Sequence, residues 1–450
     1  MNEMKSFGHA VRWVAIAVIF CAGEIGFAVP PKSADDGPRD FTITAGNAFF
    51  DQTPTLGEVC TFDFGDPAGA YNVLTGYNAA HIYDKAGTYK LTLTRAGQPP
   101  AVKTIHVQPD HRGVQLLDAR SGLVDVIRSL QNDTIILLPP GSSWDLPGPL
   151  DIKARNVEFR PSGPGPAPRI RRLASKGFSS LLCTGLDITF KGIEFDSDRD
   201  MKIVGNKKIG LRAIVPDGAH IVAIDCKFRN FDDAIFCTPM TRGLLVQWCT
   251  FTDEIRGYGM WVDGCNLAFL GNKMATSQRE HNIRSNGLNF YNLLVYDNDM
   301  TATHGKETLT FRVGQDLYAA HNAFHGWVRV GPADRGDVKA LPSAVQARYH
   351  ATHAVIERNA FLGGAILQIN EHTSDLTVRY NRIDVDAQSV PVHIQGPGCN
   401  GLVIENNYRV LTAGPTQKPY VRAMESSPGD YLERNNLTLT PEEAQSLKGK

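Results

Sequence analysis

Three arginines stand in short runs in which polar and apolar residues alternate. Arg284, Arg312 and Arg329 each alternate with aliphatic or aromatic neighbours. Because successive side chains of a β-strand point to opposite faces, inward-turned apolar residues would leave the arginines on an outer face. Like charges stacked at strand spacing repel by about 1 kcal/mol or more, so we expect a facing acid or an anionic ligand. Trp261 and Trp327 occupy similar runs and offer surfaces on which sugar rings can lie.

The turns before these runs add groups that could transfer protons. Glu280 and His281 precede one run, and His304 and Lys306 precede the next. A lysine near arginines has its pKa lowered by like charge, and a histidine titrates near neutral pH, so either could act as a base. Arginine can neutralise a carboxylate beside which a proton is removed. The residues therefore predict a cationic groove for an acidic polymer.

A repeat must position these groups. Nine aligned segments recur, and most carry an asparagine followed two residues later by an apolar residue; their shared column holds Ile193, Cys226, Cys249, Asn272, Asn298, Asn322, Asn359, Asn381 and Asn407. Most steps are in the twenties, and apolar residues alternate, which is typical of a solenoid of strands. Equivalent residues of successive coils would lie about 4.8 Å apart. We interpret the asparagines as a structural ladder.

The cysteines and the flanks of the repeat fit the same architecture. Cys226 and Cys249 occupy the repeating column, where we expect buried thiols, although a disulfide between them stays open. The sequence contains no Cys-x-x-Cys pair, so it does not indicate a structural zinc site. Residues 121–130 have helical spacing and are predicted to cover the open end of the first coil. The tail 441–450 is predicted to close or fray the other end.

The bulk properties indicate an exported protein. Lys5 and Arg12 lie before an apolar stretch from Trp13 to Gly23, which is too short for a transmembrane helix, so residues 1–28 are predicted to be a signal peptide. The net charge of −1 gives no long-range field for nucleic acid or an anionic membrane. We expect a secreted or periplasmic monomer without stable membrane insertion.

Residues 41–108 form short alternating runs suited to a small β-sandwich. Three short motifs in this region resemble those of a PKD domain: Phe62-Asp63-Phe64-Gly65-Asp66, His81-Ile82-Tyr83 and Ala86-Gly87-Thr88-Tyr89. The resemblance implies an immunoglobulin-like accessory module without chemistry of its own. We interpret Asp63 and Asp66 as turn-forming residues.

Two sequence motifs of the solenoid resemble motifs of the β-helical alginate-lyase and chondroitinase-B family. Leu309-Thr310-Phe311-Arg312-Val313-Gly314 is similar to its Leu-Thr-Leu-Arg-His-Gly strand, with Val313 in place of histidine. Glu280-His281-Asn282-Ile283-Arg284-Ser285 corresponds to its Glu-rich turn and Ile-Ser-x-Lys strand, with one acid where the family has calcium-binding acids. The resemblance implies an all-β fold, a right-handed single-stranded parallel β-helix of the pectin-lyase type over residues 112–440, preceded by the sandwich. It leaves Ca²⁺ open and implies no other cofactor.

Residues and resemblance together predict a polysaccharide lyase that cleaves a uronic-acid polysaccharide by β-elimination. Lys306 is the predicted base and His281 the competing base. The resemblance implies that Arg312 is the acid or charge stabiliser, and Arg284 would clamp the uronate. The residues predicted to hold neighbouring sugars are Arg329, Trp261, Trp327, Glu280 and His304.

Two alternatives remain. A glycoside hydrolase on the same fold needs two carboxylates, which Asp232, Asp233 and Asp263 could supply from adjacent coils. However, the sequence lacks three motifs of polygalacturonase-like enzymes: Asn-Thr-Asp, Gly-His-Gly and Arg-Ile-Lys. The second alternative is a non-catalytic exported protein that binds polysaccharide through the arginines.

Overall fold

The computed structural model describes residues 40–118, 122–173, 181–199, 210–275, 277, 279–285, 290–302, 306–332, 349–424 and 431–447. All of them belong to one compact unit, Pro38–Lys450. The predicted signal peptide lies outside the described residues. Among the described helices, none has the length and apolar character that a membrane crossing requires.

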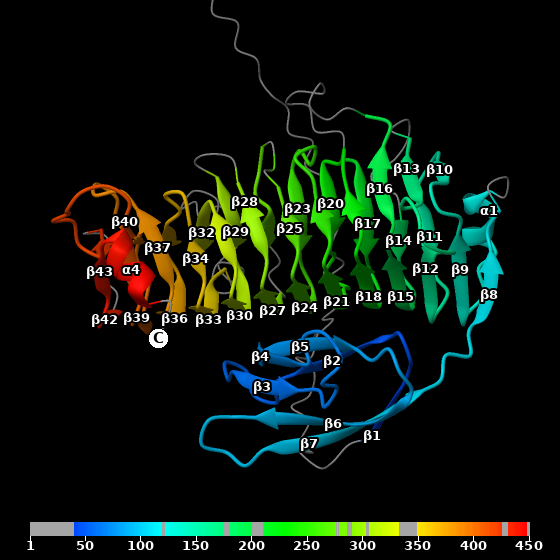
Figure 1. Ribbon diagram of the computed structural model, residues 1–450, viewed down its shortest axis with the longest axis horizontal. Helices are drawn as coiled ribbons and strands as arrows, with labels where there is room; N and C mark the ends of the chain where they lie inside the picture. The colour runs from blue at the N-terminus through cyan, green and yellow to red at the C-terminus, as the bar shows by residue number, and fades with distance from the viewer. Residues whose placement is uncertain are drawn as a thin grey trace, which may run out of the picture. The chain divides into compact units, whose positions relative to one another are not determined.

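Residues 113–439 form a right-handed parallel β-helix, as predicted (Figure 1). Each coil adds one strand to each of three parallel sheets, here called sheets I, II and III in the order in which the chain visits them. Sheet I has the longest strands, and sheet III carries the short runs with the arginines.

The strands of sheet I are β8 (Gly113–Leu116), β9 (Thr134–Leu138), β12 (Val157–Pro161), β15 (Leu186–Lys191), β18 (Ala219–Ile224), β21 (Arg242–Gln247), β24 (Cys265–Leu270), β27 (Tyr291–Tyr296), β30 (Gly314–Ala320), β33 (Ala351–Glu357), β36 (Thr373–Arg379), β39 (Leu402–Glu405) and β42 (Tyr431–Arg434). Those of sheet II are β10 (Ser143–Leu146), β13 (Arg169–Arg172), β16 (Glu194–Ser197), β19 (Lys227–Phe228), β22 (Thr250–Phe251), β25 (Lys273–Met274), β28 (Asp299–Thr301), β31 (Ala323–His325), β34 (Ala360–Phe361), β37 (Arg382–Val385), β40 (Tyr408–Leu411) and β43 (Leu437–Leu439). Those of sheet III are β11 (Leu150–Ile152), β14 (Leu181–Cys183), β17 (Arg212–Pro216), β20 (Asp233–Phe236), β23 (Tyr258–Val262), β26 (Ile283–Ser285), β29 (Glu307–Phe311), β32 (Trp327–Val330), β35 (Leu367–Ile369), β38 (Val392–Ile394) and β41 (Val421–Ala423).

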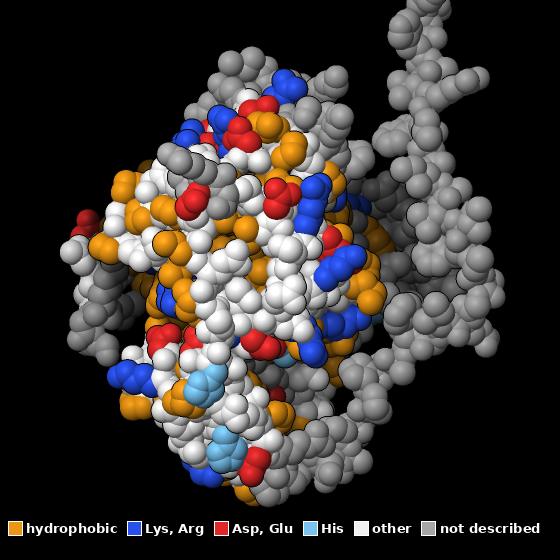
Figure 2. Space-filling view, turned by 90° about the vertical axis from the view of Figure 1, so that its right-hand side faces the viewer, with side chains coloured by type: hydrophobic (Ala, Val, Ile, Leu, Met, Phe, Trp, Pro, Cys, Tyr) orange, Lys and Arg blue, Asp and Glu red, His pale blue; other side chains and the backbone are white. Residues whose placement is uncertain are grey.

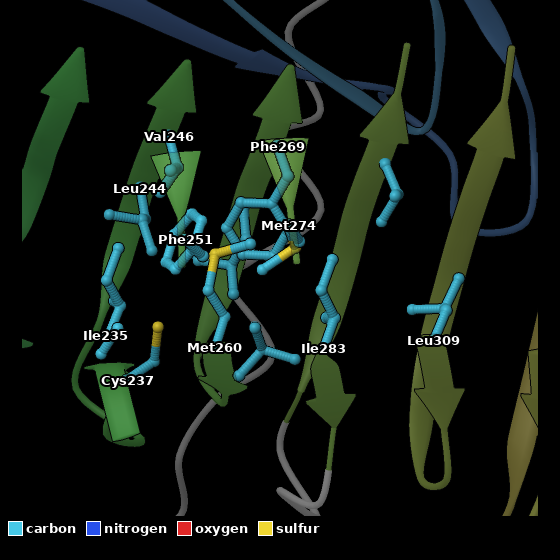
Figure 3. Close-up of a cluster of buried hydrophobic side chains, with 14 of the residues drawn as sticks. Ile235, Cys237, Leu244, Val246, Phe251, Met260, Phe269, Met274, Ile283 and Leu309 are labelled. Atoms are coloured by element: carbon cyan, nitrogen blue, oxygen red, sulfur yellow. The ribbon is translucent and has the colours of Figure 1, made fainter. Parts of the chain in front are cut away.

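The interior of the solenoid is built from stacked apolar columns (Figure 3). Ile235, Met260, Ile283 and Leu309 are register partners on successive strands of sheet III, and each is fully buried. Strand alternation therefore turns the intervening polar residues outward, as the sequence predicted. Further inward predictions that the structure confirms are Val262, Phe311, Val328, Val330, Leu367 and Ile394.

The asparagine ladder is confirmed. The Oδ1 atom of Asn298 accepts both the backbone N–H and the Nδ2–H of Asn272, each at 2.9 Å. The same pair of bonds links every following asparagine of the column as far as Asn436. The residue before each column member has a positive φ, which turns the chain from sheet I into sheet II. Cys226 and Cys249 continue the column as buried free thiols.

Both ends of the solenoid carry a short helix. Helix α1 (Leu123–Arg128) buries Leu123 and Ile127 in the solenoid core next to β10 and β11, as predicted. Helix α4 (Pro441–Leu447) packs on β40 and β43 and buries Ala444, so the tail is ordered as a helix. Figure 2 views the end at which α1 lies and shows basic, acidic and apolar side chains interspersed there.

A small β domain precedes the solenoid. Its larger sheet has the order β1-β7-β6-β3-β4, and β2 pairs with β5. The bounds are β1 (Asp40–Thr44), β2 (Ala48–Gln52), β3 (Cys60–Asp63), β4 (Val73–Gly76), β5 (Asn78–Ile82), β6 (Gly87–Thr94) and β7 (Ala101–Gln108). Asp63 accepts the N–H of Gly65 at 3.0 Å and Asp66 lies 3.0 Å from His81, so both aspartates have structural contacts. The assignment as a PKD domain stays a prediction.

The small domain shares a hydrophobic core with the outer face of sheet I. Leu245, Leu294 and Tyr318 point outward from that sheet and are buried in one cluster with Phe49 and Tyr77 of the small domain. One buried hydrogen bond also crosses the contact, from Asn78 Nδ2 to the backbone oxygen of Leu267 at 3.1 Å. The outer face of sheet I is therefore used for packing.

Candidate functional site

The outer face of sheet III carries a continuous column of side chains, here called the central column. Register pairs place Phe236, Trp261, Arg284, Thr310, Arg329, Gln368 and His393 one above another on successive strands. Arg284 and Arg329 thus share the column, with Thr310 between them. Arg312 lies two residues beyond Thr310, just past the end of β29, so it is offset along the strand from the other two arginines.

A buried carboxylate offsets the charge of Arg329. Glu307 forms an ion pair with Arg329 Nη2, and its Oε2 atom lies 2.7 Å from His281 Nδ1. Burial alone would raise the pKa of Glu307, but the hydrogen bond and charge of His281 together with the charge of Arg329 lower it. Arg329 also donates to Gln368 Oε1 at 3.1 and 3.2 Å. The facing acid that the sequence required is therefore Glu307.

The contacts of Arg284 differ from those of Arg329. Its Nη1 atom donates to the hydroxyl of Tyr258 at 2.7 Å, and its guanidinium carbon lies 5.5 Å from the ring centroids of Tyr258 and Trp261. Its Nε atom is buried and has no hydrogen-bond partner among the residues that the structure describes. The Oγ1 atom of Thr310, the next residue of the column, is also buried and has no partner within the described part of the chain. These two neighbouring residues of the column therefore present polar atoms that could bond a ligand.

Tyr258 is a site residue that the sequence analysis missed. Besides its contact with Arg284, its hydroxyl lies 3.4 Å from Glu280 Oε2. Burial, with smaller contributions from Glu280 and Asp233 that oppose the effect of Arg284, raises the pKa of Tyr258 to about 12. The phenol is therefore a neutral proton donor. Alternation could not find it, because Met260 and Val262 face the core and a strict period of two would turn Tyr258 inward as well.

The two predicted tryptophans differ in their surroundings. Phe236 stacks on Trp261 at 5.6 Å between centroids with planes 13° apart, and Arg284 lies on another side of the same ring. Arg212 in turn lies 3.3 Å from the Phe236 ring centroid. Trp261 is therefore part of a stack of rings and guanidinium groups. Trp327 is half-buried and packs against the solenoid core.

The remaining predicted residues surround the column. Arg312 is buried, with its guanidinium carbon 5.7 Å from the Tyr349 ring and its backbone N–H bonded to Ser285 Oγ at 3.0 Å. Lys306 is half-buried in the turn before β29, and its backbone oxygen accepts the Trp327 N–H at 3.1 Å. The predicted site residue His304 lies outside the described residues.

Most of the carboxylates that the hydrolase alternative would use make hydrogen bonds or ion pairs within the solenoid. Asp232 accepts the N–H of Leu211 at 3.1 Å and lies 3.5 Å from Arg256. Asp233 is fully buried and accepts the N–H of Tyr258 at 3.3 Å. Asp263 alone is half-buried, and burial raises its pKa. Two of the three aspartates therefore tie coils together instead of facing a substrate.

A calcium ion does not fit the residues of this turn. Glu280 supplies one carboxylate there, and it contacts Arg279 at 3.7 Å and Tyr258. Calcium requires six or more oxygen ligands. Within the part of the chain that the structure describes, no group of three histidine, cysteine, aspartate or glutamate side chains could hold a metal ion.

No family model matches the sequence, and no curated protein matches it. Solved structures are similar at low identity. They include an alginate lyase from Paenibacillus sp. str. FPU-7, with 10% identity over 72% of this chain and 97% of that chain and a TM-score of 0.36. PfbA, a surface adhesin of Streptococcus pneumoniae, shares 10% identity over 74% of this chain and 82% of that chain, with a TM-score of 0.42. An endo-xylogalacturonan hydrolase from Aspergillus tubingensis shares 9% identity over 74% and 94%, with a TM-score of 0.40. At such low identity and TM-scores, function has to be inferred from the site.

Proposed function

We propose that this protein is an exported polysaccharide lyase that binds a uronic-acid polysaccharide on the outer face of sheet III. The observation that carries the proposal is a pair of buried polar atoms, Arg284 Nε and Thr310 Oγ1, that have no hydrogen-bond partner among the described residues. A carboxylate placed between them would accept two hydrogen bonds, one of them from a charged donor. We call this pair the carboxylate seat.

The residues around the seat could perform β-elimination. Arg284, with Arg312 and Arg329 nearby, would stabilise the negative charge that develops on the uronate when its C5 proton leaves. Lys306 takes that proton, and the electron pair forms the C4=C5 double bond as the C4–O bond breaks. Tyr258, whose hydroxyl accepts a hydrogen bond from Arg284 and donates one to Glu280 at 3.4 Å, gives its proton to the leaving oxygen. His281 positions Glu307 and through it Arg329.

The charges of the site favour this reaction over hydrolysis. An inverting or retaining glycosidase needs two carboxyl groups on either side of the scissile bond. Asp232 and Asp233 are bonded to backbone N–H groups and arginines, and Glu307 is bonded to His281 and Arg329. Elimination needs only a neutralised carboxylate, a base and an acid, for which we propose Arg284 of the central column together with Lys306 and Tyr258 beside it.

The test is to incubate the purified protein with alginate, pectate and chondroitin and to record ultraviolet absorbance of unsaturated products. We expect absorbance to grow with at least one uronan, and to fall by about 10²-fold or more in Arg284→Ala. The matched control is Arg171→Ala, which removes an exposed arginine paired with Asp145 on sheet II and should leave the rate unchanged. New reducing ends without absorbance would contradict elimination, and binding without any product would contradict catalysis.

A further inference from the structure

A cavity of about 390 Å³ lies where the small domain meets sheet I. Tyr77 and Val59 line it from the small domain, and His353, Asp375 and Arg379 line it from β33 and β36. Its volume is within the range of small-molecule sites. The hollow belongs to a different sheet from the carboxylate seat, so its ligand does not depend on the proposed function.

Tyr77 supplies a polar group without a partner inside this hollow. The residue is 2% exposed, and within the described residues its hydroxyl makes no hydrogen bond. Burial, followed by the charges of Asp316 and Asp375, raises its pKa, so the phenol stays neutral. A neutral hydroxyl that lines a cavity without a partner can both donate and accept a bond from a ligand.

The charged groups around the hollow already compensate one another. His353 lies 3.1 Å from the buried Asp316 and 3.9 Å from Asp375. Arg379 lies 2.5 Å from Glu357, which also contacts Arg358 at 2.6 Å. Because each cation has an acid beside it, an anionic or cationic ligand would upset this balance and lose hydration without gaining a free counter-charge.

We propose that this hollow binds a neutral sugar residue. Asp375 is exposed at the mouth and can accept hydroxyl donors, while Arg379, His353 and Tyr77 can bond hydroxyl oxygens. Val59 and Val355 provide apolar surface for the C–H face of a ring. The small domain then takes part in ligand binding together with sheet I, in addition to packing on it.

The test is saturation-transfer NMR and calorimetric titration of the full chain. The probes are the methyl glycosides of glucose, galactose, mannose, rhamnose and N-acetylglucosamine, with methyl glucuronoside as the charged comparison. We expect at least one neutral glycoside to bind, and more tightly than the glucuronoside. Tyr77→Phe should weaken that binding by about fivefold or more, because it removes one hydroxyl and nothing else.

Two further variants keep the test decisive. Asp375→Asn keeps the shape and suits the positive φ of 51° at that position, so we expect it to fold, which an unchanged circular-dichroism spectrum would check. Arg284→Ala should bind the neutral glycoside as the wild type does, which separates this site from the carboxylate seat. Absence of binding by every neutral probe, tighter binding of the glucuronoside, or unchanged affinity in both Tyr77→Phe and Asp375→Asn would overturn the proposal.

Discussion

Sheets I and III are built from the same coils and share the same interior, yet their outer faces differ. On sheet I, Val222, Leu245, Ala268, Leu294 and Tyr318 form an apolar column that is buried against the small domain. On sheet III, the corresponding outer column carries rings, guanidinium groups and an amide, and two of its buried polar atoms have no partner in the part of the chain described.

This difference separates architecture from function in a solenoid. Inward residues and the asparagine ladder are set by stacking and leave little freedom. Outward residues are less constrained by stacking, so the types of side chain found there indicate what each face contacts. An apolar outer column indicates a permanent protein contact, whereas unpartnered donors indicate a ligand that comes and goes.

The largest effect should come from the face used for packing. Leu294→Ala is expected to lower the free energy of unfolding by about 2–5 kcal/mol, because it leaves a cavity in the core shared with the small domain. Gln368→Ala, in the central column of sheet III, should change it by about 1 kcal/mol or less. Urea unfolding of both variants checks the contrast, and equal losses would break it.

The ladder should be nearly as sensitive. Asn322→Ala removes the oxygen that accepts the backbone N–H and the Nδ2–H of Asn298, and leaves both donors buried. We expect a loss of about 1–3 kcal/mol, which thermal and urea unfolding would measure. Asn436→Ala, at the half-exposed last position of the ladder, is the control and should cost less.

A smaller, pH-dependent effect is expected where the small domain meets sheet I. The hydrogen bond to Asp316, with the charges of Asp316 and Asp375, raises the pKa of His353 above 6.5 despite burial. The stability from this contact is therefore fully present below pH 6.5 and is lost as the pH rises through the raised value. Arg379 and the neutral Tyr77 also line this region.

The measurement is the melting temperature of wild type and His353→Asn from mildly acidic to alkaline pH. Asparagine suits the positive φ of 52° at this position. The advantage of the wild type should be largest at the acidic end and shrink as the pH rises. A constant or growing advantage would contradict the assigned ion pair.

Much of the fold could be predicted from the sequence because it repeats. The column from Ile193 to Asn407, the inward side chains of sheet III and the capping helix near residue 123 all follow from alternation and period. The helix of the tail was missed because a polar segment shows little periodicity.

The site was harder to predict than the fold. Alternation placed Arg284 and Arg329 on one outer face, but it could not show that Thr310 lies between them or that Arg312 is offset along the strand. Nor could it show that Glu307 offsets Arg329 while Nε of Arg284 has no partner. Such pairing depends on how turns of unequal length bring side chains to the face, which spacing does not determine.

The most direct test of the carboxylate seat compares two forms of one ligand. Wild type and Arg284→Gln are titrated calorimetrically with a uronate oligosaccharide as the free acid and as its methyl ester. The wild type should prefer the free acid by about tenfold or more, since a charge-assisted hydrogen bond is lost in the ester, and the preference should disappear in Arg284→Gln. An equal preference in both proteins, or none in the wild type, would contradict the assignment of Arg284 and Thr310 as the seat.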